Sequence, residues 1–158
     1  MEPRIENSGE KKIVGKRLVM SFADYRVSEL WRSFMPRLGE ITNRTSDDMI
    51  SMAIYEPGHF ARFDPMRGFE KWAAVEVSDF LEIPDGMESF ELPAGLYAVF
   101  DYKGSNTDNA IYQYIFGTWL PGSEYLLDVR PHFEILGGKY KNNDPNSEEQ
   151  IWVPVKLK

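Results

Sequence analysis

The sequence contains no cysteine and only two histidines in 158 residues. Without cysteine the chain can form no disulfide, thiol nucleophile or thiolate metal site. His59 and His132 lie in separate segments, and neither has a second ligand at the spacing of a metal-binding motif. Dinucleotide fingerprints, phosphate loops and the G-x-S-x-G nucleophile elbow are also missing. We therefore expect no metal ion, no cofactor and no catalytic triad.

Long apolar runs and a surplus of positive charge are missing as well. The chain has 25 acidic and 18 basic residues, and its net charge of -7 would repel a phosphate backbone. No segment approaches the ~18 consecutive apolar residues of a membrane span, and the N-terminal MEPRIENSGEKK does not resemble a signal peptide. We expect a cytoplasmic protein that binds neither nucleic acid nor membranes directly.

Apolar side chains are plentiful. Hydrophobic residues make up 42% of the chain and aromatic residues 14%, which predicts a folded protein with a sizeable core. The length is that of one ordinary domain, and no flexible linker interrupts it. We predict a single domain over residues 1–158, in which the polar residues 1–10 are frayed.

The first half of the chain predicts a strand, a helix and two further strands. Alternation and helical spacing place them at residues 11–20, 27–41, 49–56 and 70–79. Pro36 should kink or end the helix because it removes a backbone hydrogen bond. Gly15 predicts a bulge or a close backbone approach within the first strand.

The second half predicts the same order of elements. A long strand over residues 88–102 bends at Pro93, and a helix follows between the N-cap Thr107 and Pro121. Two more strands cover residues 132–136 and 151–157. Because each helix has one apolar stripe, the duplicated strand-helix-strand-strand units predict an α+β domain. Its two helices pack on a common antiparallel sheet, with a cleft between the halves where a small molecule would bind.

Glu134 interrupts an otherwise apolar strand in PHFEILGG. Alternation turns Phe133 and Ile135 to one side and His132, Glu134 and Leu136 to the other. Two interpretations remain open. Glu134 faces solvent, as ionised glutamates without partners usually do, or it lies in the cleft, where a desolvated carboxylate would hold a cation or act as a general acid.

Several stretches together resemble the GyrI-like small-molecule-binding domain, the effector-binding part of AraC-type and MerR-type drug-responsive regulators. They are ELPAGLYAVFDYKG, FGTWLPGS, HFEIL and EEQIWVPVKLK, preceded by KKIVGKRLVM and ELWRSF. The resemblance covers nearly the whole chain and implies the duplicated fold with its ligand cleft. The chain has no room for a helix-turn-helix segment, so it resembles a stand-alone member.

The resemblance also implies a set of ligand-binding residues. A family glutamate that neutralises lipophilic cations inside an aromatic pocket corresponds to Glu134, and the tryptophans of the family's W-L-P and V-P-V segments correspond to Trp119 and Trp152. Many relatives carry an aromatic residue where this chain has Leu136. Face assignment adds to the candidate set Trp31, Tyr55, Trp72, Tyr112 and Leu136.

Three functions follow as hypotheses. The chain binds small lipophilic, cationic compounds for sensing or sequestration, in a pocket where Glu134 neutralises the charge. Alternatively, it is a hydrolase that opens strained rings of toxic alkylators with Glu134 as acid or base. A third reading, by family analogy, is a protein-interaction role, with a regulatory protein as partner or as an inhibitor of DNA gyrase.

Overall fold

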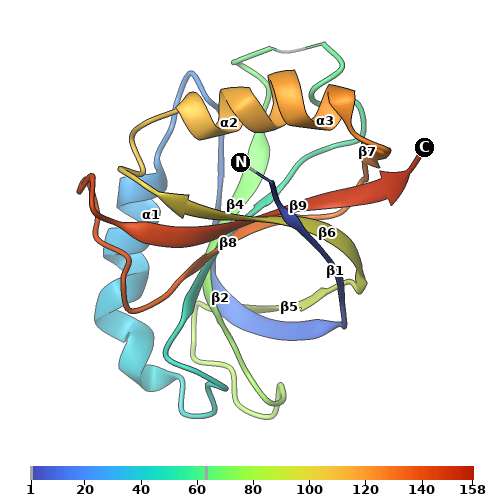
Figure 1. Cartoon of the computed structure of the whole chain (residues 1–158). Coiled ribbons are helices and arrows are strands. Elements are labelled where there is room, and N and C mark those ends of the chain that lie inside the picture. The colour runs from blue at the N-terminus through green and yellow to red at the C-terminus, as the bar shows by residue number, and fades with distance from the viewer. Residues whose placement is uncertain (1, 63) are drawn as a thin grey trace.

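The computed structural model describes residues 2–62 and 64–158, and over these it forms one long antiparallel sheet with helices on it (Figure 1). The strands are β1 Arg4–Ser8, β2 Lys11–Met20, β3 Met49–Ile54, β4 Phe69–Glu76, β5 Glu88–Leu92, β6 Gly95–Lys103, β7 Tyr125–Leu127, β8 His132–Leu136 and β9 Glu148–Leu157. Their order across the sheet is β1-β6-β9-β8-β3-β4-β2-β5, and β7 pairs with β9 at one end. The predicted α+β class with an antiparallel sheet is confirmed.

Two helical segments cross the sheet. The first consists of α1 Val27–Phe34 and a 3-10 turn Met35–Glu40, so the helix changes pitch next to Pro36 as the sequence predicts. The second runs through α2 Ala110–Tyr114, a π-helical stretch Ile115–Trp119 and α3 Leu120–Gly122. None of the helices described is long and apolar enough to cross a membrane.

Both helical segments pack on the same face of the sheet. One backbone row joins Ala73 of β4, Ser51 of β3, Glu134 of β8 and Ile151 of β9, so these side chains share a face. Ala73 belongs to the core cluster under α1, and Ile151 belongs to the cluster under α2. The strip of sheet between the two helices is therefore formed by β3 and β8.

The opposite face of the sheet closes on itself rather than on a helix. Its core cluster joins Leu92 of β5 to Tyr97 of β6, although these strands lie near opposite ends of the strand order. The sheet must curve strongly to bring them together, as Figure 1 shows for β5, β6 and β1. Residues on this face therefore lie on the side of the sheet away from both helical segments.

Three local predictions need correction. Residues 4–8 are not frayed but form β1, which pairs with Val99 to Gly95 of β6; their polar composition suits an edge strand. The second helix begins at Ala110 after Asn109, and Thr107 does not cap it. The short strand β7 was not expected from the sequence.

Gly15 behaves as expected. A Cβ at this position would lie 2.1 Å from the carbonyl oxygen of Ala73 in the neighbouring strand β4, so only glycine permits this approach. The predicted break at Pro93 also occurs, because β5 pairs with β2 whereas β6 pairs with β1 and β9.

Candidate ligand-binding site

Glu134 lies on β8, in the strip of sheet between the two helical segments. Its side chain is half-buried and shares the helix-covered face with Ser51 of β3 and Ile151 of β9. The hydroxyl of Tyr112, on α2, donates a hydrogen bond to Glu134 Oε1. The structure thus places this carboxylate beneath α2 rather than on an outer face.

A second carboxylate lies beside it. Glu149 of β9 is only 7% exposed, and its Oε2 atom has no hydrogen-bond partner among the described residues. Burial, followed by the negative charge of Glu134 and a hydrogen bond to it, raises the pKa of Glu149 to about 8. The Lys71 ammonium acts in the opposite direction. At neutral pH Glu149 is therefore mainly a neutral acid that can donate to Glu134.

Four tyrosines from separate segments surround the two carboxylates. Burial raises the pKa of the phenols of Tyr55 and Tyr112, and it raises that of Tyr140 to about 12. In all three, smaller contributions come from the charge of Glu134 and from the nearby Tyr25. These phenols stay neutral at physiological pH and offer ring faces and hydroxyl donors to the space above Glu134.

The segment that follows β3 places the rings of Tyr55, His59 and Phe60 at one end of the site. We call these three residues the aromatic loop. The ring centroid of Tyr55 lies 4.8 Å from that of His59 and 5.0 Å from that of His132. Phe60, at the tip of this loop, stacks on Phe116 of the second helix, with centroids 5.7 Å apart and planes 12° from parallel. Phe60 therefore contacts the second helical segment above the part of the sheet formed by β3 and β8.

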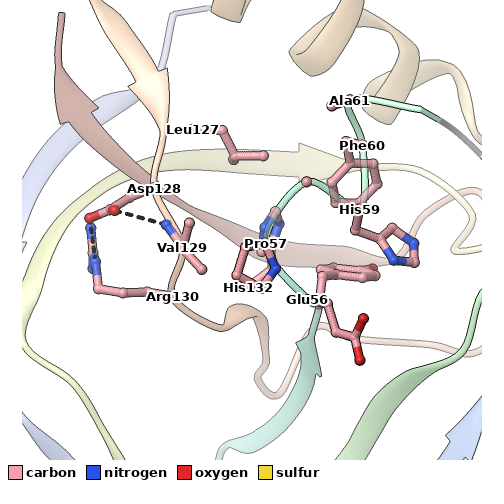
Figure 2. A pocket seen from close by; sticks show the side chains of 12 residues that line it. Glu56, Pro57, His59, Phe60, Ala61, Leu127, Asp128, Val129, Arg130 and His132 are labelled. Atoms are coloured by element: carbon pink, nitrogen blue, oxygen red, sulfur yellow. Dashed lines mark hydrogen bonds and ion pairs between the residues drawn. The ribbon is translucent and has the colours of Figure 1, made fainter.

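A cavity of about 130 Å³ lies beside this cluster. Figure 2 shows Pro57, His59, Phe60 and His132 on one side of it and Val129 on the other, and Glu134 is not among its lining residues. Sites for drug-sized ligands usually measure about 300–1,000 Å³. The cavity is therefore smaller than a drug-sized ligand, and it does not reach Glu134.

His132 is packed between Tyr55 and Phe60 at this end of the site. Burial, helped by the charge of Lys71, lowers its pKa to about 3. Below about pH 6.5 His132 is protonated in the unfolded chain but stays neutral in the folded protein. Folding stability is therefore lost as the pH falls from about 6.5 towards 3.

Lowering the pH from 7 to 5 should reduce the free energy of unfolding of the wild type by about 2 kcal/mol more than that of His132→Gln. Urea unfolding of both proteins at the two pH values measures this difference. Contributions of other groups occur in both proteins and cancel. Equal losses in wild type and variant would show that His132 titrates normally in the folded state.

The structure brings together only some of the residues singled out from the sequence. Glu134, Tyr112 and Tyr55 lie at one site, as described above. Leu136 is on the same face of β8 but is buried, at 5% exposure.

The four tryptophans lie elsewhere. Trp72 and Trp152 are buried on the opposite face of the sheet, where Trp152 stacks on Phe133 at a centroid distance of 5.1 Å. Trp31 packs edge-on against Phe34 within α1. Trp119 packs against Phe100 and Tyr125, under the far end of the second helix. Among residues 2–62 and 64–158, none of the four makes a ring contact with Tyr55, His59, Phe60 or Tyr112.

Sequence reasoning missed several residues of the site. Tyr25, Tyr140 and Phe60 carry no local signal, because only chain folding brings their segments together. Lys71 does alternate along β4 with Phe69, Ala73 and Val75, which are all buried. Glu149 carries a similar signal: it alternates with Ile151, Val153 and Val155, which are all buried. Extending that period by two residues would have placed Glu149 on the helix-covered face.

Comparison with known proteins supplies the family. The family model of Cass2, the integron-associated effector binding protein, matches residues 4–155. The transcriptional regulator BrlR of Pseudomonas aeruginosa is 28% identical over 157 residues, which are 98% of this chain and 56% of that protein. The chain thus spans little more than half the length of this curated relative.

Two solved structures show the same fold. SAV2435 bound to tetraphenylphosphonium matches with a TM-score of 0.68 at 19% identity, over 99% of this chain and 94% of that one. The integron cassette protein VCH_CASS2 of Vibrio cholerae matches with a TM-score of 0.64 at 13% identity, over 98% and 96% of the two chains. The resemblance to effector-binding domains seen in the sequence is confirmed.

Proposed function

Because the chain belongs to the family of integron-associated effector-binding proteins, we propose that it binds lipophilic organic cations between its two helical segments, with Glu134 as the counter-charge. The observation that carries this proposal is the position of Glu134, half-buried on the helix-covered face and hydrogen-bonded by Tyr112. Effector binding of this kind serves sensing or sequestration of the compound.

The chemistry of the site favours a cation. A carboxylate that is partly removed from water gains from a neighbouring positive charge, because the low dielectric strengthens their attraction. Tyr112 and Tyr55 add ring faces, and a cation over an aromatic ring gains roughly 0.5–2 kcal/mol depending on desolvation. The net charge of -7 draws cations towards the protein as a whole.

We infer that ligand entry displaces the side chains of His59 and Phe60, in the segment that follows β3. His59 is 1% exposed, yet neither of its ring nitrogens has a hydrogen-bond partner among the described residues. Leaving a buried polar group unsatisfied costs about 1–3 kcal/mol. Displacing these side chains returns the His59 ring to water, which offsets part of the cost of separating Phe60 from Phe116 when a ligand enters.

A solved relative with the same fold supports the ligand class. The structure of SAV2435 is bound to tetraphenylphosphonium, a bulky lipophilic cation. The likeness to a transcriptional regulator, of which this chain covers 56%, supports a role in sensing.

Isothermal titration with tetraphenylphosphonium tests the proposal. We expect saturable binding of one molecule in the micromolar range, and much weaker binding of triphenylphosphine oxide, which keeps three of the four phenyl rings but has no net charge. The same titration in high salt should weaken cation binding only modestly, since a half-buried pair is poorly screened. Equal affinity for the charged and uncharged compounds, or no saturable binding, would contradict the proposal.

A further inference from the structure

Glu134 and Glu149 lie on adjacent strands and face the same side of the sheet. Glu134 is paired across the backbone with Ile151, and Glu149 precedes Ile151 by two residues. The two glutamates are therefore diagonal neighbours on one face, within reach of each other's long side chains. Two carboxylates in such a setting cannot both be charged without a large electrostatic penalty, so they share one proton.

The groups that face Glu149 come from five further parts of the fold. They are Glu134 of β8, Lys71 of β4, Tyr102 of β6, Tyr112 of α2 and Tyr140 of the loop between β8 and β9. Lys71 is only 8% exposed and its side-chain ammonium forms no ion pair or hydrogen bond with any described residue, yet its charge acts on both Glu149 and His132. Lys71 therefore supplies a positive charge of the protein's own beside the two glutamates.

These charges balance when the site is empty. Glu134 contributes one negative charge and Lys71 one positive charge, while Glu149 keeps its proton because its pKa is about 8. The proton also supplies a hydrogen-bond donor. A protonated Glu149 can donate to Glu134, whereas two ionised carboxylates have no donor between them. An organic cation entering this neutral cluster would leave an uncompensated positive charge in a poorly hydrated place.

We propose that the site exchanges a proton for a cation: when an organic cation settles beside Glu134, Glu149 releases its proton to solvent. This inference rests on the proposed cation binding and adds its coupling to pH. In the exchange the O–H bond of the Glu149 carboxyl breaks, its electron pair stays on the carboxylate, and the proton passes to water or buffer. The cluster is neutral before and after, with Glu149 and Glu134 together balancing Lys71 and the ligand.

The exchange sets the direction of the pH dependence. Below about pH 8 a proton must be removed before the cation is fully accommodated, so affinity rises with pH in this range and levels off above it. For one proton lost from a group that titrates near pH 8, the affinity at pH 8 exceeds that at pH 6 by about 50-fold. Measuring this pH dependence requires a permanently charged ligand, because the charge of such a ligand does not change over this pH range.

Titration calorimetry with tetraphenylphosphonium, in buffers of different ionisation enthalpy, counts the protons exchanged. At pH 7 we expect release of close to one proton per ligand bound. Glu149→Gln, which keeps the shape and neutrality of the protonated acid, should reduce this number to near zero and make the affinity independent of pH, at the level of the wild type at low pH. Glu148→Gln is the matched control, because Glu148 is the preceding residue of β9 and is ion-paired with Lys139 instead.

The outcomes separate this inference from the function on which it rests. Saturable binding without proton release, or release that persists in Glu149→Gln, overturns the exchange and leaves cation binding intact. Release that also disappears in Glu148→Gln overturns the assignment to Glu149. Absence of any tetraphenylphosphonium binding overturns both.

Discussion

Replacing Glu134 by glutamine should weaken tetraphenylphosphonium binding by about 2–4 kcal/mol, the usual effect of removing one partner of a buried charge pair. That corresponds to roughly a 30- to 700-fold higher Kd. The fold should survive, since glutamine has the same shape and can still accept the hydrogen bond that Tyr112 donates to position 134. Calorimetric titration of the purified variant measures the loss directly.

Two comparisons make the result specific to charge. Binding of the uncharged triphenylphosphine oxide should change little in Glu134→Gln, because ring stacking does not depend on the carboxylate. Glu82→Gln, at an exposed position with no ion pair among the described residues, should bind the cation like the wild type. If Glu134→Gln kept wild-type affinity for the cation, the counter-charge would have to be assigned to another residue.

Replacing Glu149 by glutamine should stabilise the protein increasingly as the pH rises. The pKa of Glu149 is about 8 in the folded protein, against 4.5 in the unfolded chain, so the folded state holds an extra proton between these values. Stability conferred by this group is complete below about pH 4.5 and is lost as the pH rises through 8. Between pH 5 and pH 8.5 this loss amounts to about 3–4 kcal/mol in the wild type and is absent from the variant.

Urea unfolding at the two pH values measures the effect as a difference between the curves of wild type and Glu149→Gln. Titrating groups that do not contact Glu149 contribute equally to both proteins. Glu148→Gln should follow the wild type at both pH values. Parallel stability curves for wild type and Glu149→Gln would mean that Glu149 is ionised in the folded state, and the proton exchange would lose its basis.

The two experiments on Glu149 are independent. Stability is measured without ligand and reports whether the acid holds its proton in the empty site. Calorimetry reports whether a ligand removes it. A protein in which the first result holds and the second does not would bind its cation by Glu134 alone, with Glu149 serving only as the donor that orients that carboxylate.

Much of the architecture can be predicted from local patterns. The period of two in HFEIL put Glu134 opposite Phe133, and the structure has them on opposite faces of β8. Pro36 changes the helix, and Gly15 permits the close approach of β4, because both effects depend on the residue's own backbone. Which aromatic residues belong to the site could not be predicted in the same way. An aromatic side chain on a strand can pack on either face of a sheet, so its presence does not indicate which face it occupies.

The sequence by itself therefore determined where strands and helices occur and which residues share one side of each strand, because these follow from the period of the local backbone. Only the tertiary structure decided which side of the sheet the helices cover, and with it that Trp72 and Trp152 lie away from Glu134 while Tyr112 lies above it. The meeting of Glu134, Glu149 and Lys71 from three different strands depends on strand order and register, which are set by contacts between residues far apart in the chain.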